Sequence, residues 1–172
     1  MIDEKDLLQS QHQEQNSEDE QEEIFTPLQP TSRRDIRALG FHYVYAVDRN
    51  DYKASLDDVV AQFEKEFNVV VPDDSYAITL AQGAIDHRDE LDTIFEPVLK
   101  NWDIGRIGCC TKLILRMGVW ELRSTDKEAA VILNEAVELA KAFAEKDSFK
   151  FVNGVLDEVA QSLGRRTEEK SA

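Results

Sequence analysis

The sequence predicts an all-α protein, folded as a compact bundle of about seven helices. Apolar residues recur at helical spacing in several windows, and no window has the sustained alternation expected of strands. The chain has 172 residues, of which 42% are hydrophobic, so it is long enough for one domain with a real core. Together these observations favour helices packed on helices.

Both ends of the chain differ from the body in composition. Residues 1–31 hold nine acidic residues and one basic residue, for a net charge of -8. They bury too little apolar surface to offset the entropy of ordering, so we expect a disordered acidic tail with a linker at Pro27 and Pro30. Residues 32–164 form the helical domain, and residues 165–172 form a charged C-terminal tail.

The first two helices follow from capping residues and apolar spacing. The first begins at Thr31 or Ser32, both good N-caps. One face of it carries the apolar positions Ile36, Leu39, Gly40, Tyr43 and Val47. The second helix repeats that spacing with Leu56, Val59, Val60, Phe63 and Phe67.

A third helical segment begins near residue 76, after caps at Asp73, Asp74 or Ser75. Its apolar stripe continues across a bend near residue 90, where Pro97 permits a kink or a new start. The positions of this stripe are Leu80, Ala84, His87, Leu91, Ile94, Val98 and Trp102.

The remaining helices complete the bundle. Residues 106–122 are apolar on nearly every side, which is typical of a buried central helix. Its charged residues Lys112, Arg116 and Glu121 must therefore be paired or reach the surface. The next helix carries its stripe around residues 132–143, and Asp147 or Ser148 caps the last one. Gly164 ends that helix.

Residue patterns typical of enzymes and metal sites are absent from the sequence. There is no phosphate-binding glycine loop, no HExxH or GxSxG motif, and no histidine pair at metal spacing, so we expect no catalytic residue, metal or cofactor. The adjacent Cys109 and Cys110 have no disulfide framework, which predicts a reducing, cytoplasmic location. No run approaches the length of a membrane span.

A basic cluster opens the first helix. Arg33, Arg34 and Arg37 are three or four residues apart, and the helical wheel puts Phe41 on the same face, away from the apolar stripe. Guanidinium groups bind phosphates and an exposed ring stacks on bases, so this pattern predicts single-stranded RNA binding. Asp35 lies inside the cluster and reduces its field.

A second basic and aromatic cluster surrounds the break between the last two helices. It consists of Lys141, Phe143, Lys146, Phe149, Lys150 and Phe151. Phe143 follows the helix stripe and is expected in the core, whereas Phe149 or Phe151 is the better candidate for exposure.

Several segments, read in order, resemble the NusB family of transcription antitermination factors. Arg33-Arg34-x-x-Arg37 followed by Tyr45 resembles the opening of that family. Residues 76–102 and residues 112–122 also resemble segments of that family. The most specific motif is NEAVELAKAFAEKDSFKFVNG, at residues 134–154. The resemblance covers about residues 32–163.

The resemblance implies an all-α fold of two small subdomains and a function without enzymatic activity. Members bind the boxA element of ribosomal RNA leader transcripts together with NusE, a small-subunit ribosomal protein, and help RNA polymerase to read through terminators. The implied partners are therefore boxA-type single-stranded RNA, NusE and the RNA polymerase antitermination complex, with no membrane.

The resemblance also implies roles for individual residues. The implied RNA contacts are Arg33, Arg34, Arg37, Asp147, Lys150 and Phe151, to which the helical wheel adds Phe41. The implied NusE-facing region contains Tyr45, Thr111 and Lys112. The chain departs from the family pattern at Asp35, at Thr111, where an acid is common, and at Phe149, where a histidine is usual.

Three questions stay open at the level of sequence. The acidic balance of the chain favours an alternative, a protein–protein adaptor of the same fold with weak or lost RNA binding. NusB-like domains also accompany RNA methyltransferases, so a module serving a separate methyltransferase is a further alternative. The acidic tail is either a solvating segment or a decoy that competes with RNA, and the chain is either a monomer or a homodimer.

Overall fold

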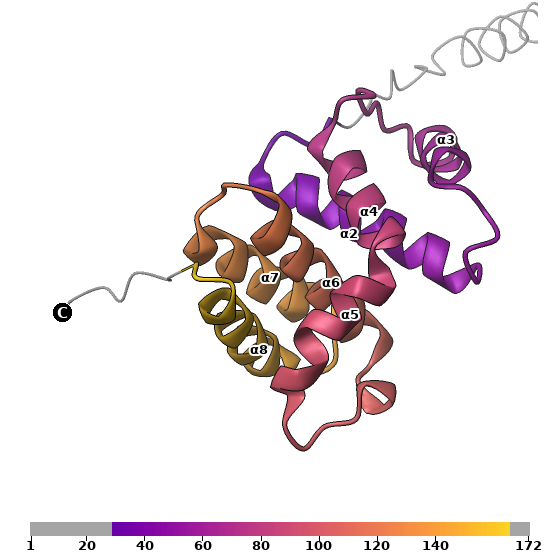
Figure 1. Ribbon diagram of the computed structural model, residues 1–172. Helices are drawn as coiled ribbons and strands as arrows, with labels where there is room; N and C mark the ends of the chain where they lie inside the picture. The colour runs from indigo at the N-terminus through magenta and orange to yellow at the C-terminus, as the bar shows by residue number, and fades with distance from the viewer. Residues whose placement is uncertain (1–28, 166–172) are drawn as a thin grey trace, which may run out of the picture.

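The computed structural model describes residues 29–165, which contain seven α-helices and two short 3₁₀ helices (Figure 1). The α-helices are α2 (Arg33–Arg49), α3 (Leu56–Phe67), α4 (Tyr76–Asp86), α5 (Arg88–Phe95), α6 (Cys109–Ser124), α7 (Ala129–Phe143) and α8 (Ser148–Ser162). The 3₁₀ helices η1 (Glu96–Leu99) and η2 (Ile104–Arg106) lie between α5 and α6. The all-α prediction is confirmed. The predicted acidic tail and most of the C-terminal tail lie outside the described residues.

Serine side chains begin the first three of these helices. Ser32 accepts a hydrogen bond from the backbone N–H of Asp35, and Ser55 and Ser75 do the same for the first turns of α3 and α4. The left-handed residues Asn68 and Gly164 follow α3 and α8 and stop them. The break after α4 occurs at His87, close to the bend expected from the sequence.

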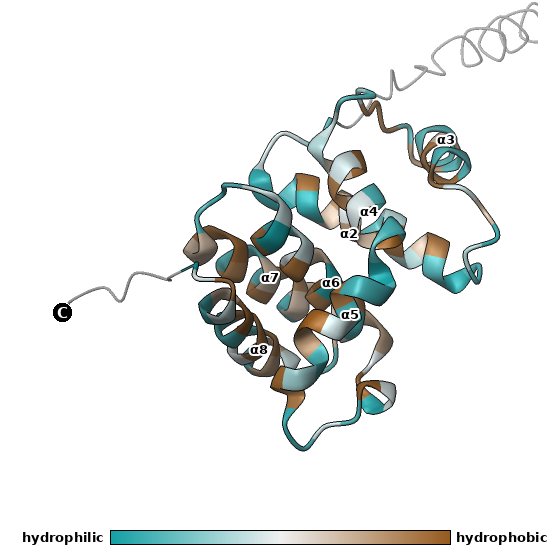
Figure 2. Ribbon diagram, viewed as in Figure 1, coloured by the Kyte–Doolittle hydropathy of each residue, from teal (hydrophilic) through white to brown (hydrophobic). Residues whose placement is uncertain are grey.

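Helix α6 is the centre of the molecule, as its apolar sequence predicts. It contacts α2 and α4 on one side and α5, α7 and α8 on the other, so it joins an N-terminal group of helices to a C-terminal group. Apolar residues face the interior of both groups, and hydrophilic residues face outward (Figure 2). Arg116 of α6 is paired as expected, because it donates to both carboxylate oxygens of Asp92, at 2.7 Å each.

Helix α3 is peripheral and packs against α2 and α4 (Figure 1). Leu56 and Val59 on its inner side are buried. The expectation that Phe67 belongs to the buried stripe is wrong, because its side chain is 57% exposed in the last turn, beyond the reach of α2. Phe67 instead lies against the ring of Phe63, with 5.2 Å between ring centroids.

Candidate nucleic-acid interface

The first turn of α2 presents two arginines to solvent. Arg33 and Arg34 are exposed, and the side chain of Arg34 is 64% accessible. The neighbouring Asp35 is held by the helix cap, because its carboxylate accepts a hydrogen bond of 2.6 Å from the hydroxyl of Ser32. The acid therefore stabilises the helix start, where the macrodipole favours negative charge.

Arg37 does not lie on the surface with the other two arginines, which corrects the sequence prediction. Its side chain is 4% exposed and forms a bidentate ion pair with Glu121 of α6, with Nη2–Oε1 at 2.6 Å and Nε–Oε2 at 3.1 Å. Tyr76 of α4 donates to the same carboxylate at 2.8 Å. Burial, together with the charge of Glu121, raises the pKa of the Tyr76 hydroxyl well above its ordinary value. Arg37 thus locks α2, α4 and α6 together beneath Arg33, whose carbonyl oxygen it also contacts.

Phe41 is also buried, so the prediction of an exposed ring at this position is wrong. Its side chain is 3% exposed. The ring stacks on Phe143 of α7, with centroids 4.8 Å apart and planes inclined by 15°. The helical wheel gives the direction of Phe41 but not the helix that covers it, and α7 covers that side of α2.

The junction between α7 and α8 carries the second predicted cluster. Asp147 precedes α8 with a left-handed backbone, at φ 63°, and both Asp147 and Lys150 are exposed. Phe149 and Phe151 are half-buried, as is Phe143. Phe149 lies between two ammonium groups, 5.4 Å from that of Lys141 and 5.8 Å from that of Lys150.

A continuous chain of side-chain contacts joins these two clusters, which are more than 100 residues apart in sequence. Arg34 approaches Glu138 of α7 at 3.6 Å, and Glu138 accepts a hydrogen bond of 3.2 Å from Lys141. Lys141 in turn lies over the ring of Phe149. The start of α2 and the start of α8 are therefore parts of one surface, which we call the basic–aromatic surface: Arg33, Arg34, Lys141, Phe149, Lys150 and Phe151.

The residues expected to face a protein partner divide into exposed and buried ones. Tyr45 is 38% exposed on α2, and Lys112 is half-buried. Thr111 is buried at 3%, so the expectation of a surface position is wrong for its side chain. Its hydroxyl donates to the carboxylate of Glu145, which reaches back from the α7–α8 junction and is exposed at that point.

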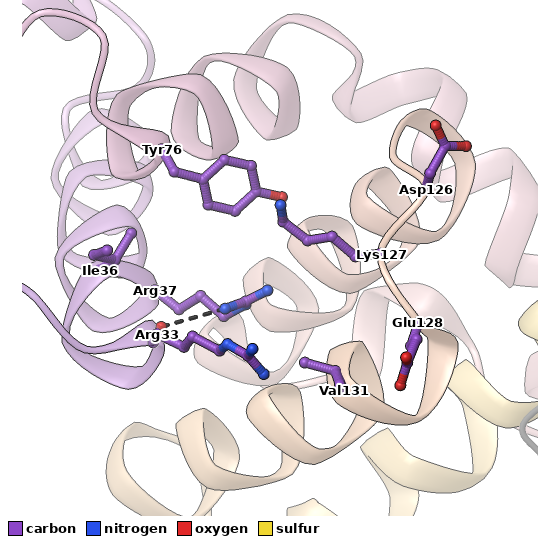
Figure 3. Close-up of a pocket in the computed structure, with 8 residues that line it drawn as sticks. All are labelled: Arg33, Ile36, Arg37, Tyr76, Asp126, Lys127, Glu128 and Val131. Carbon is purple, nitrogen blue, oxygen red and sulfur yellow. Dashed lines mark hydrogen bonds between the residues drawn. The ribbon is translucent and has the colours of Figure 1, made fainter.

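A cavity of about 560 Å³ lies beside the start of α2 (Figure 3). Arg33 and Arg37 extend into it toward Val131 of α7, and the ammonium group of Lys127 lies 4.1 Å from the centroid of the Tyr76 ring. Its walls thus combine the buried ion pair of Arg37 with exposed charges of both signs. Sequence reasoning did not single out Lys127, because the loop before α7 has no basic or aromatic pattern.

Trp102 is a further position that the sequence analysis misassigned. The helical stripe predicted it in the core, but it is 60% exposed. Lys100 has a positive φ of 53°, which ends the helical register two residues earlier and turns Trp102 outward. The ring then packs beside Phe151, with 5.8 Å between centroids.

The described part of the chain offers neither a metal site nor a membrane-spanning helix. Among residues 29–165, no group of three His, Cys, Asp or Glu side chains is arranged to hold a metal ion. Within the same part of the chain, every helix is too short or too polar to cross a lipid bilayer.

The fold agrees with comparisons to known proteins. The NusB family profile matches residues 34–161. The chain belongs to the NusB family. It is 35% identical over 125 residues to the transcription antitermination protein NusB of Nitratiruptor sp., covering 73% of this chain and 87% of that protein. It is 38% identical over 126 residues to the NusB protein of Ligilactobacillus salivarius, and the match covers 73% of this chain and 95% of that protein.

Solved NusB structures have the same fold. The solution structure of NusB from Aquifex aeolicus matches with a TM-score of 0.65 and 30% identity, over 81% of this chain and 95% of that one. A crystal structure of antitermination factors NusB and NusE in complex with double-stranded RNA also matches with a TM-score of 0.65 and 30% identity. This match covers 76% of this chain and 96% of that one. NusB proteins are transcription antitermination factors and not enzymes.

Proposed function

We propose that this protein is an RNA-binding antitermination factor that works with NusE. In this proposal the pair binds boxA-type RNA in ribosomal RNA leader transcripts and promotes read-through by RNA polymerase, in the cytoplasm. The observation that carries the proposal is the chain of contacts from Arg34 through Glu138 and Lys141 to Phe149. It unites cations and aromatic rings from two distant segments on one surface, which is the combination that single-stranded RNA requires.

The exposed members of the basic–aromatic surface have distinct roles in this proposal. Arg33, Arg34 and Lys150 contact phosphates, and Phe151 stacks on a base, with Asp147 beside it as a hydrogen-bond acceptor. Arg37 and Phe41 act from below the surface, because both are buried. Arg37 holds the backbone of Arg33, and Phe41 supports the end of α7 through Phe143.

The NusE-facing surface in this proposal includes Tyr45 and Lys112, with Thr111 beneath it. Support comes from the similarity to the solved complex of NusB and NusE with RNA.

A gel-shift experiment tests the proposal. BoxA-type RNA and a scrambled RNA of equal length are titrated with the protein, with and without NusE, at low salt. We expect a shift of the boxA-type RNA that is strengthened by NusE. The absence of any shift under either condition would contradict the proposal.

The second candidate is an adaptor that binds protein partners but little RNA, and the net charge of -15 favours it. Co-purification with NusE in the absence of any RNA shift would support this candidate. Binding to an RNA methyltransferase rather than to NusE would instead indicate a module of that enzyme. A homodimer that covers the basic–aromatic surface would release RNA as the protein concentration rises.

A further inference from the structure

A second cavity, of about 320 Å³, lies next to the basic–aromatic surface, between η2 and the start of α8. Trp102 and Phe151 form its aromatic side, and Arg106, Lys146 and Glu145 are among its charged residues. We propose that this cavity binds one unstacked base of the RNA, with Trp102 as the stacking surface. This inference rests on the proposed function and adds a base-binding site to it.

The exposure of Trp102 is the first argument. The ring is 60% exposed, although the chain has only two tryptophans and an exposed indole contributes little to a core. Phe151 supports one side of it at 5.8 Å, with the planes inclined by 56°. A centroid separation of 5.8 Å is that of two aromatic rings in direct contact, with no room for a base between them. The separation is too small for insertion, so the base stacks on the free face of Trp102.

The charges around the cavity are the second argument. Arg106 and Lys146 line it and are both exposed, so they can contact the phosphates on either side of a bound base. Phe151 belongs to the cavity and to the basic–aromatic surface alike, and Lys150 lies next to it in α8. An RNA strand that crosses the basic–aromatic surface can therefore continue to Trp102 past Arg106 and Lys146, although Glu145 and Asp147 also line the cavity.

Glu145 is the third argument and predicts which bases fit. One of its carboxylate oxygens accepts from Thr111. The other lies so close to Gly108 that a Cβ there would be 1.8 Å from it, so the carboxylate is held in place against a bare backbone. A carboxylate only accepts hydrogen bonds and has about four acceptor positions. Adenine, cytosine and guanine each present an exocyclic amino group with two N–H donors, whereas uracil has carbonyl acceptors in place of an amino group and a single N3–H donor. We therefore expect a base with an amino group to be preferred over uracil.

The experiment uses the full chain with NusE and fluorescein-labelled boxA-type RNA, in fluorescence anisotropy. Trp102→Leu should weaken binding by about fivefold to a hundredfold, because base–aromatic stacking is worth that much per base. Trp102→Phe should restore most of the loss. The matched control is Phe67→Leu, which removes a similarly exposed ring from α3 and should bind as the wild type does.

An RNA series with one abasic position at a time identifies the bound base. One position should weaken binding to the wild type and have no further effect on Trp102→Leu. Uracil at that position should weaken binding to the wild type, and Glu145→Gln should reduce this discrimination. Equal affinity of wild type and Trp102→Leu, or an identical abasic profile for both, would overturn the inference while leaving the proposed function intact. Failure of the wild type to bind the RNA with NusE would overturn both.

Discussion

Glu121 shows how a single buried residue can hold three helices. Its carboxylate accepts from Arg37 of α2 and from Tyr76 of α4, and it is itself part of α6. Both members of the ion pair are almost fully buried, at 4% and 3% exposure. In such a buried ion pair each charge is compensated by the other. Removing either partner leaves the other as an uncompensated buried charge.

We therefore expect Arg37→Gln to lower the free energy of unfolding by about 3–5 kcal/mol, because Glu121 loses its counter-charge. The matched control is Arg34→Gln, whose side chain is 64% exposed and whose ion pair should be worth less than about 1 kcal/mol. Urea denaturation measures both. A loss for Arg37→Gln no larger than that of Arg34→Gln would contradict the structural role.

His42 makes stability depend on pH. The side chain of His42 is exposed, but the neighbouring rings of Phe63 and Phe143 desolvate part of its imidazole and lower its pKa below the ordinary value of 6.5. The unfolded chain then binds this proton more readily than the folded one, so the free energy of unfolding falls as the pH drops through about 6.5. His42→Gln should lose less stability than wild type between pH 7.5 and 5.5 in urea denaturation. Equal losses would show that His42 does not contribute.

At the scale of elements, apolar periodicity predicted the seven helices and the central position of α6. It succeeded because core-facing positions in a helix repeat every three or four residues. Periodicity gave the wrong exposure for Phe41 and Trp102, because the position of a residue on the helical wheel does not say whether another helix covers its side chain. Phe41 is covered by α7, and Trp102 leaves its stripe at the positive φ of Lys100. The basic–aromatic surface could not be predicted from the sequence, because it depends on the tertiary contact between α2 and α7 and no local pattern encodes that contact.

Close packing of α4 on α6 depends on Gly83. A Cβ at this position would meet the ring of Trp120 at 2.0 Å, so Gly83→Ala should displace the ring and cost about 1–3 kcal/mol. Gly154→Ala is the matched control: nothing lies within 4 Å of its added Cβ, and α8 should gain about 0.5–1 kcal/mol. Thermal unfolding of the two variants should move in opposite directions. A shift of the same sign in both would refute the packing argument.

The exposed start of α2 should contribute to RNA binding through charge. Replacing Arg34 by Gln removes one phosphate contact, so the slope of log affinity against log salt should fall in magnitude by about 0.7. Lys65→Gln, an exposed cation at the end of α3, is the matched control and should leave the slope unchanged. An unchanged slope for Arg34→Gln would exclude a phosphate contact at this residue.

At the scale of the whole molecule, negative charge is concentrated at one end of the sequence. Residues 1–31 carry -8 and the remaining 141 residues carry -7. The acidic segment leads directly into α2, where Arg33 and Arg34 are exposed. We expect a negative segment that is covalently linked to the start of α2 to compete with RNA at a high effective concentration.

Deleting residues 1–30 should therefore tighten the binding of boxA-type RNA severalfold at low salt, and the gain should shrink as salt screens the competing charges. A variant of full length with the nine acidic residues of this segment replaced by Asn or Gln separates charge from bulk, and it should match the deletion. Fluorescence anisotropy at two salt concentrations measures all three proteins. If the deletion tightens binding but the neutral segment does not, the segment acts by steric exclusion. Equal affinity of all three proteins would mean that the acidic segment is only a spacer.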